Sequence, residues 1–444
     1  DWSNIQANAI YGIYAGMVYF LAVPGGWIAD NILGYQKAVL IGALIITLGH
    51  FTLAIPLEQT FILGLVFVAI GTGLLKPNIS SIVGQLYSQN DSRRDSGFTI
   101  FYMAINIGSM LGFAVCGWLG EKVGWHFGFG AAGVGMLFGV TQFILFRHQL
   151  GEAGKYPNIV NEQTKTNYIR GVGLVVILIA SVVITGMAGF WSIDPVYFAE
   201  RFRDFLVVIS IIYFIYLLFF AGLTANEKKN VLMLLLLFIG AAAFWSGFDQ
   251  SAGSLTIFTR DYVNLTFGTF TAPVSWTQFV NPLFVVMFAP FFAYLWVFLG
   301  KRNLDPNMPI KFSIGLILMA FGFIVMILAV KYALVSSPVG VQWLLLTYLL
   351  HTFGELTLSP VGLSAFSKYS PKRYLGQMMG IWFLASSLGG VLAGLLGGEA
   401  TESGLESMSP VFTELVYYCL AIAVVLIALS FFIKGAKTDT IPDK

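Results

Sequence analysis

Three ionisable side chains lie in the middle of long apolar stretches, where a charge is costly. Lys76 lies in GTGLLKPN, Asp249 in FWSGFDQSAGS and Glu355 in HTFGELTLSPVGLS. A charge at the centre of a bilayer costs about 3 kcal/mol or more, so such residues are candidates for a functional site. A lysine can bind a carboxylate, one acid can bind an ammonium group, and the other can load and release a proton. The three residues therefore suggest a site for a zwitterion, coupled to protons.

Two purely structural explanations remain open for these charges. Lys76 could extend its aliphatic stem to the lipid headgroups, although roughly a helical turn or more of apolar chain flanks it on both sides. The three residues could also form ion pairs without binding any ligand. Replacing a buried ion pair by apolar residues is often neutral or stabilising, which makes the structural explanation less attractive than the functional one.

The composition places these residues in a membrane. The chain is 57% hydrophobic and only 10% charged, whereas soluble domains carry about 25% charged residues. Continuous apolar runs of about 20 residues predict an all-α polytopic membrane protein rather than a barrel of alternating strands. The predicted spans are residues 5–28, 38–56, 61–83, 98–120, 127–146, 171–191, 205–223, 231–258, 279–299, 312–330, 341–366, 375–397 and 411–433.

The loops between these spans predict an orientation and a domain organisation. Most of the 24 Lys and Arg residues fall in alternate loops on one side, which makes that side, and the C-terminus, cytoplasmic. We expect helical bundles in 1–150 and 229–444, joined by a linker with an inserted hairpin in 151–228. The order of features around Lys76 repeats around Glu355, as in transporters built from two halves. Six spans in each half would require a helix ahead of Asp1, so we expect the first helix to be missing.

Several function classes receive no support from the sequence. A net charge of +2 gives no reason to expect a nucleic-acid partner. Cys116 and Cys419 lie in apolar runs and are expected to be free thiols. No ATP-binding loop, zinc-protease motif or nucleophile elbow is present. We therefore expect no enzyme activity, no metal and no cofactor, and an ion gradient as the energy source.

Several motifs resemble those of one transporter family. FTIFYMAINIGSM at 98–110, GTGLLKPN at 71–78, GELTLSPVGLS at 354–364 and the stretch 377–390 are similar to motifs of the proton-dependent oligopeptide transporters. The turn at 26–37 resembles the loop motif of the major facilitator superfamily, to which that family belongs. The resemblance implies two six-helix bundles plus the extra helix pair of bacterial members, in a monomer of the cell membrane. It also implies a peptide bound between the bundles near the bilayer midplane.

The resemblance implies roles for individual residues. Lys76 would bind the peptide carboxylate and Glu355 its ammonium group, and both would share proton coupling with Asp249. The remaining substrate-binding residues would be Tyr19, Asn106 and Asn281 on the peptide backbone, with Trp382 and Ser386 lining the side-chain pocket. The ExxER segment of the family's first helix is absent from this sequence. The second-helix histidine of animal members is also not evident, so coupling would rest on carboxylates.

The implied function is proton-coupled import of di- and tripeptides by alternating access. One rival is a related carrier of nitrate or another anion, which would not need Glu355 because an anion has no ammonium group. Another is a receptor or channel that uses the same helices without coupled transport. A membrane enzyme is the least supported alternative, since no nucleophile or metal site is recognisable.

Overall fold

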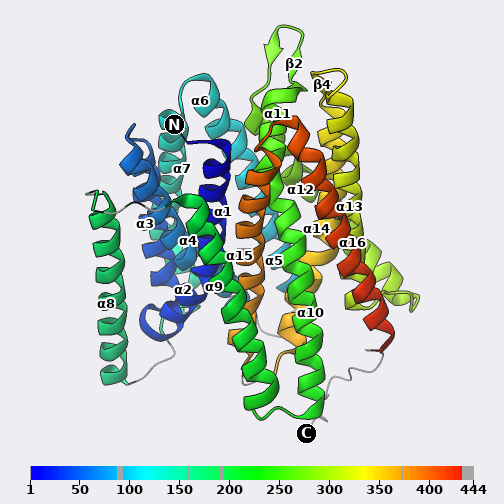
Figure 1. The fold of residues 1–444 in the computed structure, drawn as a ribbon. Helices are drawn as coiled ribbons and strands as arrows, with labels where there is room; N and C mark the ends of the chain where they lie inside the picture. Colours follow the sequence, from blue (N-terminus) through cyan, green and yellow to red (C-terminus); the bar gives the residue numbers. More distant parts are fainter. Residues whose placement is uncertain are drawn as a thin grey trace. The chain divides into compact units, whose positions relative to one another are not determined.

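A computed structural model of the chain is almost entirely helical (Figure 1). It describes residues 2–87, 94–157, 161–187, 189–190, 192, 194–371 and 374–432. Arg93, Lys372, Arg373 and the C-terminal tail, all expected to be cytoplasmic, lie outside the described residues. The chain divides into unit 1, Asp1–Gly16 with Pro195–Lys444, and unit 2, Met17–Asp194. This division is made by contacts, and the three-part domain organisation expected from the sequence stays a prediction.

Unit 2 is organised around two helices whose backbones touch. Its elements are α2 (Ala22–Ile28), η1 (Ala29–Leu33), α3 (Tyr35–Leu53), α4 (Glu58–Gln85), α5 (Arg94–Leu111), η2 (Gly112–Gly117), α6 (Trp118–Lys122), α7 (Trp125–Phe146), η3 (Arg147–Leu150) and α8 (Glu162–Met187). A Cβ added to Gly42 of α3 would lie 2.7 Å from the carbonyl oxygen of Gly71 of α4. A Cβ on Gly71 would lie 2.6 Å from the Gly42 oxygen. Only glycine permits this approach, which is typical of packed membrane helices.

Unit 1 holds the remaining elements. Helix α1 (Asn4–Phe20) begins in unit 1 and ends in unit 2, and unit 1 continues with α9 (Pro195–Ile215), η4 (Tyr216–Phe220), α10 (Ala225–Phe248), η5 (Asp249–Ser251), α11 (Ser254–Tyr262), β1 (Val263–Asn264), β2 (Thr266–Phe267), β3 (Phe270–Thr271), η6 (Val274–Phe279), α12 (Val280–Lys301), α13 (Met308–Ala333), β4 (Val339–Gly340), α14 (Gln342–Tyr369), α15 (Leu375–Ala400) and α16 (Leu405–Phe432). Strands β2 and β3 form a short antiparallel hairpin beyond α11, and β1 pairs in parallel with β4 (Figure 1).

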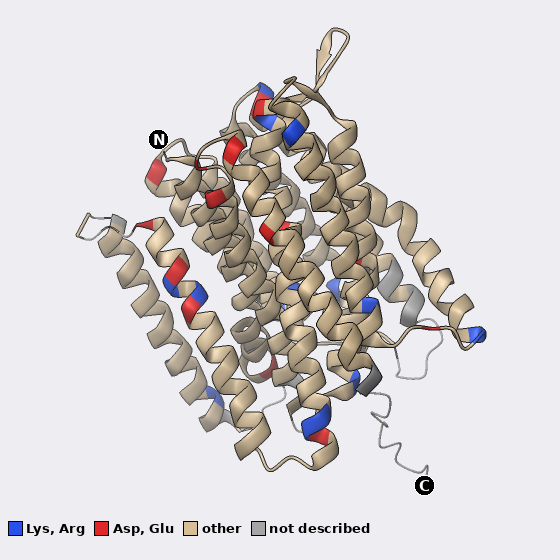
Figure 2. Cartoon of the chain, turned by 45° about the vertical axis from the view of Figure 1, so that its right-hand side comes forward, with Lys and Arg blue, Asp and Glu red and all other residues tan. Residues whose placement is uncertain are grey.

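The helical segments confirm the polytopic membrane fold predicted from the sequence. Among the described residues, twelve helices are long and apolar enough to cross a membrane. Helix α14, at 28 residues, is long enough to be one of them, but it carries His351 and Glu355 and is less apolar. Each of the thirteen predicted spans falls on a helical segment. Lys, Arg, Asp and Glu residues gather near helix ends and leave most helical turns uncharged (Figure 2).

Both helices of the predicted hairpin begin earlier than expected, and the first, α8, begins at Glu162 rather than at residue 171. The second helix, α9, begins at Pro195 rather than at residue 205, so its first turns are charged. Arg201 pairs there with Asp204, with 3.1 Å between Nη1 and Oδ2. One face of α9 packs within unit 1, where Leu206 is fully buried, while Ile211 and Ile212 are exposed. The apolar window of α8, in unit 2, has no buried residue, which suits a helix that faces lipid.

Candidate functional site

Lys76 projects from α4 where a proline interrupts the helical hydrogen bonds. Pro77 has no N–H group and cannot donate to the carbonyl oxygen of Gly73, four residues earlier. That carbonyl lies against Gly25 of α2, where a Cβ would be 2.1 Å from it. Lys76 is exposed, and its Nζ lies 4.1 Å from the centroid of the Tyr19 ring. The ring face stabilises the ammonium group by a cation–π contact worth about 0.5–2 kcal/mol.

Asn78 of α4 and Asn106 of α5 make different contacts. Asn78 is 1% exposed, and its Nδ2 donates to the carbonyl oxygens of Leu74 at 2.7 Å and Gly25 at 3.2 Å. It therefore ties α4 to α2. Asn106, the residue expected to bind peptide, is half-buried on α5 and donates from Nδ2 to the Tyr102 carbonyl at 2.9 Å. This bond is within its own helix and leaves Oδ1 as the acceptor of that side chain.

Glu355 of α14 is held by a side chain from α12. Asn281 donates from Nδ2 to Glu355 Oε2 at 3.1 Å and to Thr352 Oγ1 at 3.0 Å. Thr352 is fully buried, and its hydroxyl donates to the Tyr348 carbonyl at 2.6 Å. The structure thus brings together Asn281 and Glu355, which the sequence suggested separately. It also adds Thr352, whose spacing of three residues from Glu355 places it on the same helix face.

An apolar cluster positions α12 against α14. Val285 and Phe292 of α12 are buried with Leu356 of α14. The rings of Phe288 and Phe353 meet edge-to-face with centroids 5.0 Å apart. Aromatic pairs of this kind add about 0.5–1.5 kcal/mol beyond the area that they bury. This packing sets the distance over which Asn281 reaches Glu355.

Asp249 lies at a break between two helices rather than inside one. Helix α10 ends at Phe248, and residues 249–251 form a 3-10 turn ahead of α11. Gln250 is fully buried and donates from Nε2 to the Ala393 carbonyl of α15 at 3.0 Å. Its Oε1 accepts a hydrogen bond of 2.6 Å from Ser254. Gln250 therefore fastens the break to α15 and holds the half-buried Asp249 at an interrupted helix, as in many transporter sites.

Trp382 and Ser386, expected to line a side-chain pocket, are both buried in α15, at 6% and 3% exposure. The Trp382 ring lies 5.4 Å from the ring of Phe366 and 6.4 Å from that of Phe312. It also fills the space over Gly362, where a Cβ would lie 2.1 Å from the ring. Trp382 thus packs α13, α14 and α15 together, and its role toward a substrate stays a prediction.

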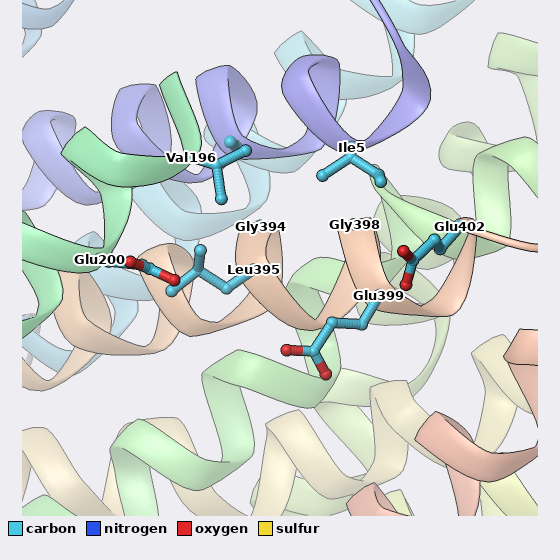
Figure 3. A pocket seen from close by; sticks show the side chains of 9 residues that line it. Ile5, Val196, Glu200, Gly394, Leu395, Gly398, Glu399 and Glu402 are labelled. Carbon is cyan, nitrogen blue, oxygen red and sulfur yellow. The ribbon is translucent and has the colours of Figure 1, made fainter. Parts of the chain in front are cut away.

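A cavity of about 150 Å³ lies elsewhere in unit 1, between α1, α9 and α15 (Figure 3). Ile5 and Val196 point toward the turns of α15 that carry Gly394 and Gly398. Its lining residues are Ile5, Ala9, Val196, Glu200, Gly394, Leu395, Gly398, Glu399 and Glu402. None of the site residues expected from the sequence is among them. The lining offers carboxylates but no cation, so it does not match both ends of a zwitterion.

Comparison with known proteins places these features in one family. Residues 36–405 match the family model PTR2, described as the POT family. Peptide transporter YePEPT of Yersinia enterocolitica is 39% identical over 98% of this chain and 87% of its own length. A di-/tripeptide transporter of Lactococcus lactis subsp. cremoris is 36% identical over 86% of this chain and 78% of its own.

Solved structures agree with the sequence relatives. A crystal structure of a peptide transporter POT in complex with sulfate matches with a TM-score of 0.89 and 35% identity, over 98% of this chain and 88% of that one. A POT family transporter in complex with 5-aminolevulinic acid matches with a TM-score of 0.88 and 32% identity, over 98% and 89%. These matches confirm the fold of the major facilitator superfamily. Since the family model covers most of the chain and the Yersinia relative nearly all of it, the chain belongs to the POT family.

Proposed function

We propose that the chain imports di- and tripeptides together with protons, by alternating access across the cell membrane. The proposal rests on two opposite charges, those of Lys76 and Glu355, each of which is held by a neighbouring side chain. Lys76 lies over the Tyr19 ring in unit 2, and Glu355 accepts from Asn281 in unit 1. A free peptide carries a carboxylate at one end and an ammonium group at the other. Lys76 offers the charge that the peptide carboxylate requires, and Glu355 offers the charge that the ammonium group requires.

Specificity for backbone and termini follows from this chemistry. Lys76 would bind the carboxylate, Glu355 the ammonium group, and Tyr19, Asn106 and Asn281 the peptide backbone. Buried polar groups that lose a partner disfavour the wrong ligand, so an analogue without an ammonium group should bind poorly. Trp382 and Ser386 would shape the space for side chains, because Trp382 packs the three helices α13–α15 together.

Proton coupling is assigned to Asp249, Lys76 and Glu355, driven by the gradient without a cofactor. Asp249 lies at the break between α10 and α11, where a small change of the helix axes changes the surroundings of the carboxyl group. Desolvation favours the neutral form of a carboxyl group in general, and a nearby cation favours the charged form. Moving one proton inward across 100 mV releases about 2.3 kcal/mol, enough for roughly 50-fold accumulation of a neutral substrate.

The membrane placement belongs to the same proposal. We assign the chain to the cell membrane as a monomer, with the C-terminus cytoplasmic. The distribution of Lys and Arg over alternate loops supports this orientation. Labelling single cysteines introduced at Lys229 and Lys331 in intact cells tests it. The cysteine of Lys331→Cys should react with an impermeant thiol reagent, and the cysteine of Lys229→Cys should not. The reverse pattern would show that the topology is inverted.

Uptake into liposomes tests the function directly. The purified full-length protein is reconstituted, an inward proton gradient is imposed, and uptake of labelled dialanine is followed with and without an uncoupler. Free alanine and nitrate serve as controls. We expect uncoupler-sensitive accumulation of dialanine and neither control. Nitrate uptake without dialanine uptake would make the chain an anion carrier, and flux without saturation would make it a channel.

Dependence on pH tests the proton assignment. Asp249→Asn removes the titratable group but keeps the shape of the side chain. We expect accumulation driven by the proton gradient to fall strongly, while exchange of labelled for unlabelled dialanine without a gradient is retained. Wild-type accumulation in this variant would remove Asp249 from proton coupling.

A further inference from the structure

The buried hydroxyl of Thr352 and the carboxylate of Glu355 both accept hydrogen bonds from the amide of Asn281. Thr352 Oγ1 donates its one hydrogen to the Tyr348 carbonyl at 2.6 Å. Toward other neighbours this oxygen therefore has only lone pairs. The atom of Asn281 that faces it at 3.0 Å must be a donor, which identifies it as Nδ2.

The orientation of the Asn281 amide follows from this constraint. Its NH2 group has two hydrogens, and Thr352 Oγ1 and Glu355 Oε2 accept one each. The carbonyl oxygen Oδ1 is turned away from the Glu355 carboxylate, and no described residue donates to it. In the reverse orientation, Oδ1 would face both the carboxylate and the lone pairs of Thr352, which is repulsive.

We propose that Thr352 is a positioning residue that fixes the Asn281 amide, so that its N–H groups face Glu355 and its Oδ1 is left to accept a substrate N–H. The inference rests on the proposed function for its ligand, a peptide, but not for its geometry. Amide oxygen and nitrogen are nearly equal in size, so the packing around Asn281 does not distinguish the two orientations. The Thr352 hydroxyl does, because its hydrogen is already bonded to the backbone.

The chain offers a matched set of variants. Thr352→Val keeps the branched shape without the hydroxyl, and Thr352→Ser keeps the hydroxyl. Thr357 is the control, because it is buried on the same helix, at 2% exposure, and bonds the Gly354 carbonyl at 2.8 Å. Thr357→Val removes an equivalent backbone bond that does not involve Asn281.

Infrared spectra without substrate test the geometry. The difference between wild type and Glu355→Gln defines the bands of the Glu355 carboxyl group in the full-length protein. We expect Thr352→Val to shift these bands, because Asn281 is no longer held against Glu355. Thr352→Ser and Thr357→Val should leave them in place. Unchanged bands in Thr352→Val would overturn the proposal.

Dialanine uptake tests the consequence for the substrate. We expect Thr352→Val to raise the KM about three- to tenfold, the range for loss of one neutral hydrogen bond, with the maximal rate within about twofold. Thr352→Ser should restore the wild-type KM, and adding Thr352→Val to Asn281→Ala should cause no further rise. Independent, multiplying effects would show that Thr352 does not act through Asn281.

The two readouts separate this proposal from the proposed function. A band shift in Thr352→Val, with no dialanine uptake by the wild type, would keep the role of Thr352 and remove the peptide substrate. Uptake by the wild type, with the bands and the KM unchanged in Thr352→Val, would keep the function and remove the role of Thr352.

Discussion

Helices α4 and α14 are built alike, although they belong to different units. Each is 28 residues long, has an internal proline and carries one of the two charges proposed to bind peptide termini. Each also touches the preceding helix through glycine. Gly71 meets Gly42 of α3, and Gly354 meets Gly315 of α13, where an added Cβ would lie about 2.6–3.0 Å from the opposing carbonyl oxygen.

The two charges on this common framework are held in different ways. Lys76 lies on the face of an aromatic ring, a contact that leaves the three ammonium donors free to turn. Glu355 accepts from an amide whose own direction is set by Thr352. The Lys76 ammonium group can therefore adjust to a bound carboxylate, whereas the Glu355 carboxylate is held in a fixed orientation.

Removing the cation should have the largest effect. We expect Lys76→Ala to lower gradient-driven dialanine uptake about a hundredfold or more, because a peptide carboxylate would then be desolvated without a partner. Liposome uptake at equal protein density measures it. Lys122→Ala, an exposed lysine at the end of α6, is the matched control. Near-normal uptake in Lys76→Ala would remove this residue from the site.

Neutralising Glu355 should have the next largest effect, and it should depend on the substrate. We expect Glu355→Gln to raise the KM for dialanine about tenfold or more, because the ammonium group loses its counter-charge. For N-acetyl-dialanine, which has no ammonium group, the change should be much smaller. Competition against labelled dialanine measures the affinity for each compound. An equal loss of affinity for the two compounds would show that Glu355 does not bind the amino terminus.

The glycine contacts of α4 with α3 and of α14 with α13 can be disrupted by alanine substitutions. We expect Gly42→Ala to destabilise the protein by about 1–3 kcal/mol, because its Cβ would lie 2.7 Å from the Gly71 oxygen. Gly315→Ala should cost less, since its Cβ would lie 3.0 Å from the Gly354 oxygen. Thermal unfolding in detergent measures both, with Gly135→Ala, which has open space, as control. A more destabilising Gly315 variant would reverse the expected order.

Removing the Tyr19 ring beneath Lys76 should have the smallest effect on dialanine uptake. Tyr19→Phe keeps the ring face, whereas Tyr19→Leu removes it. We expect the leucine variant to raise the dialanine KM about two- to fivefold more than the phenylalanine variant, the range of a partly exposed cation–π contact. If both variants raise the KM for dialanine by the same factor, the hydroxyl group rather than the ring supports substrate binding.

Much of the fold could be predicted from apolar stretches alone. Within a bilayer every backbone polar group must be bonded inside its own helix, so a long apolar run has few alternatives to a spanning helix. The charged first turns of α9 escaped this reasoning because they are not apolar. The break after Phe248 could not be predicted in this way, because Gln250 bonds to Ala393, which is far along the chain but adjacent in the fold.

The order of apolar and charged residues predicted which charges lie in the membrane, and the motifs at 71–78, 98–110 and 354–364 indicated the family. Lys76, Asp249 and Glu355 stand out because apolar surroundings make each one costly. The contacts that hold the charges come from the packing of helices: Lys76 lies over the Tyr19 ring, and Glu355 accepts from an amide that Thr352 orients. Hydrogen bonds between α12 and α14 depend on ångström distances set by packing, which the order of residues along one helix does not contain.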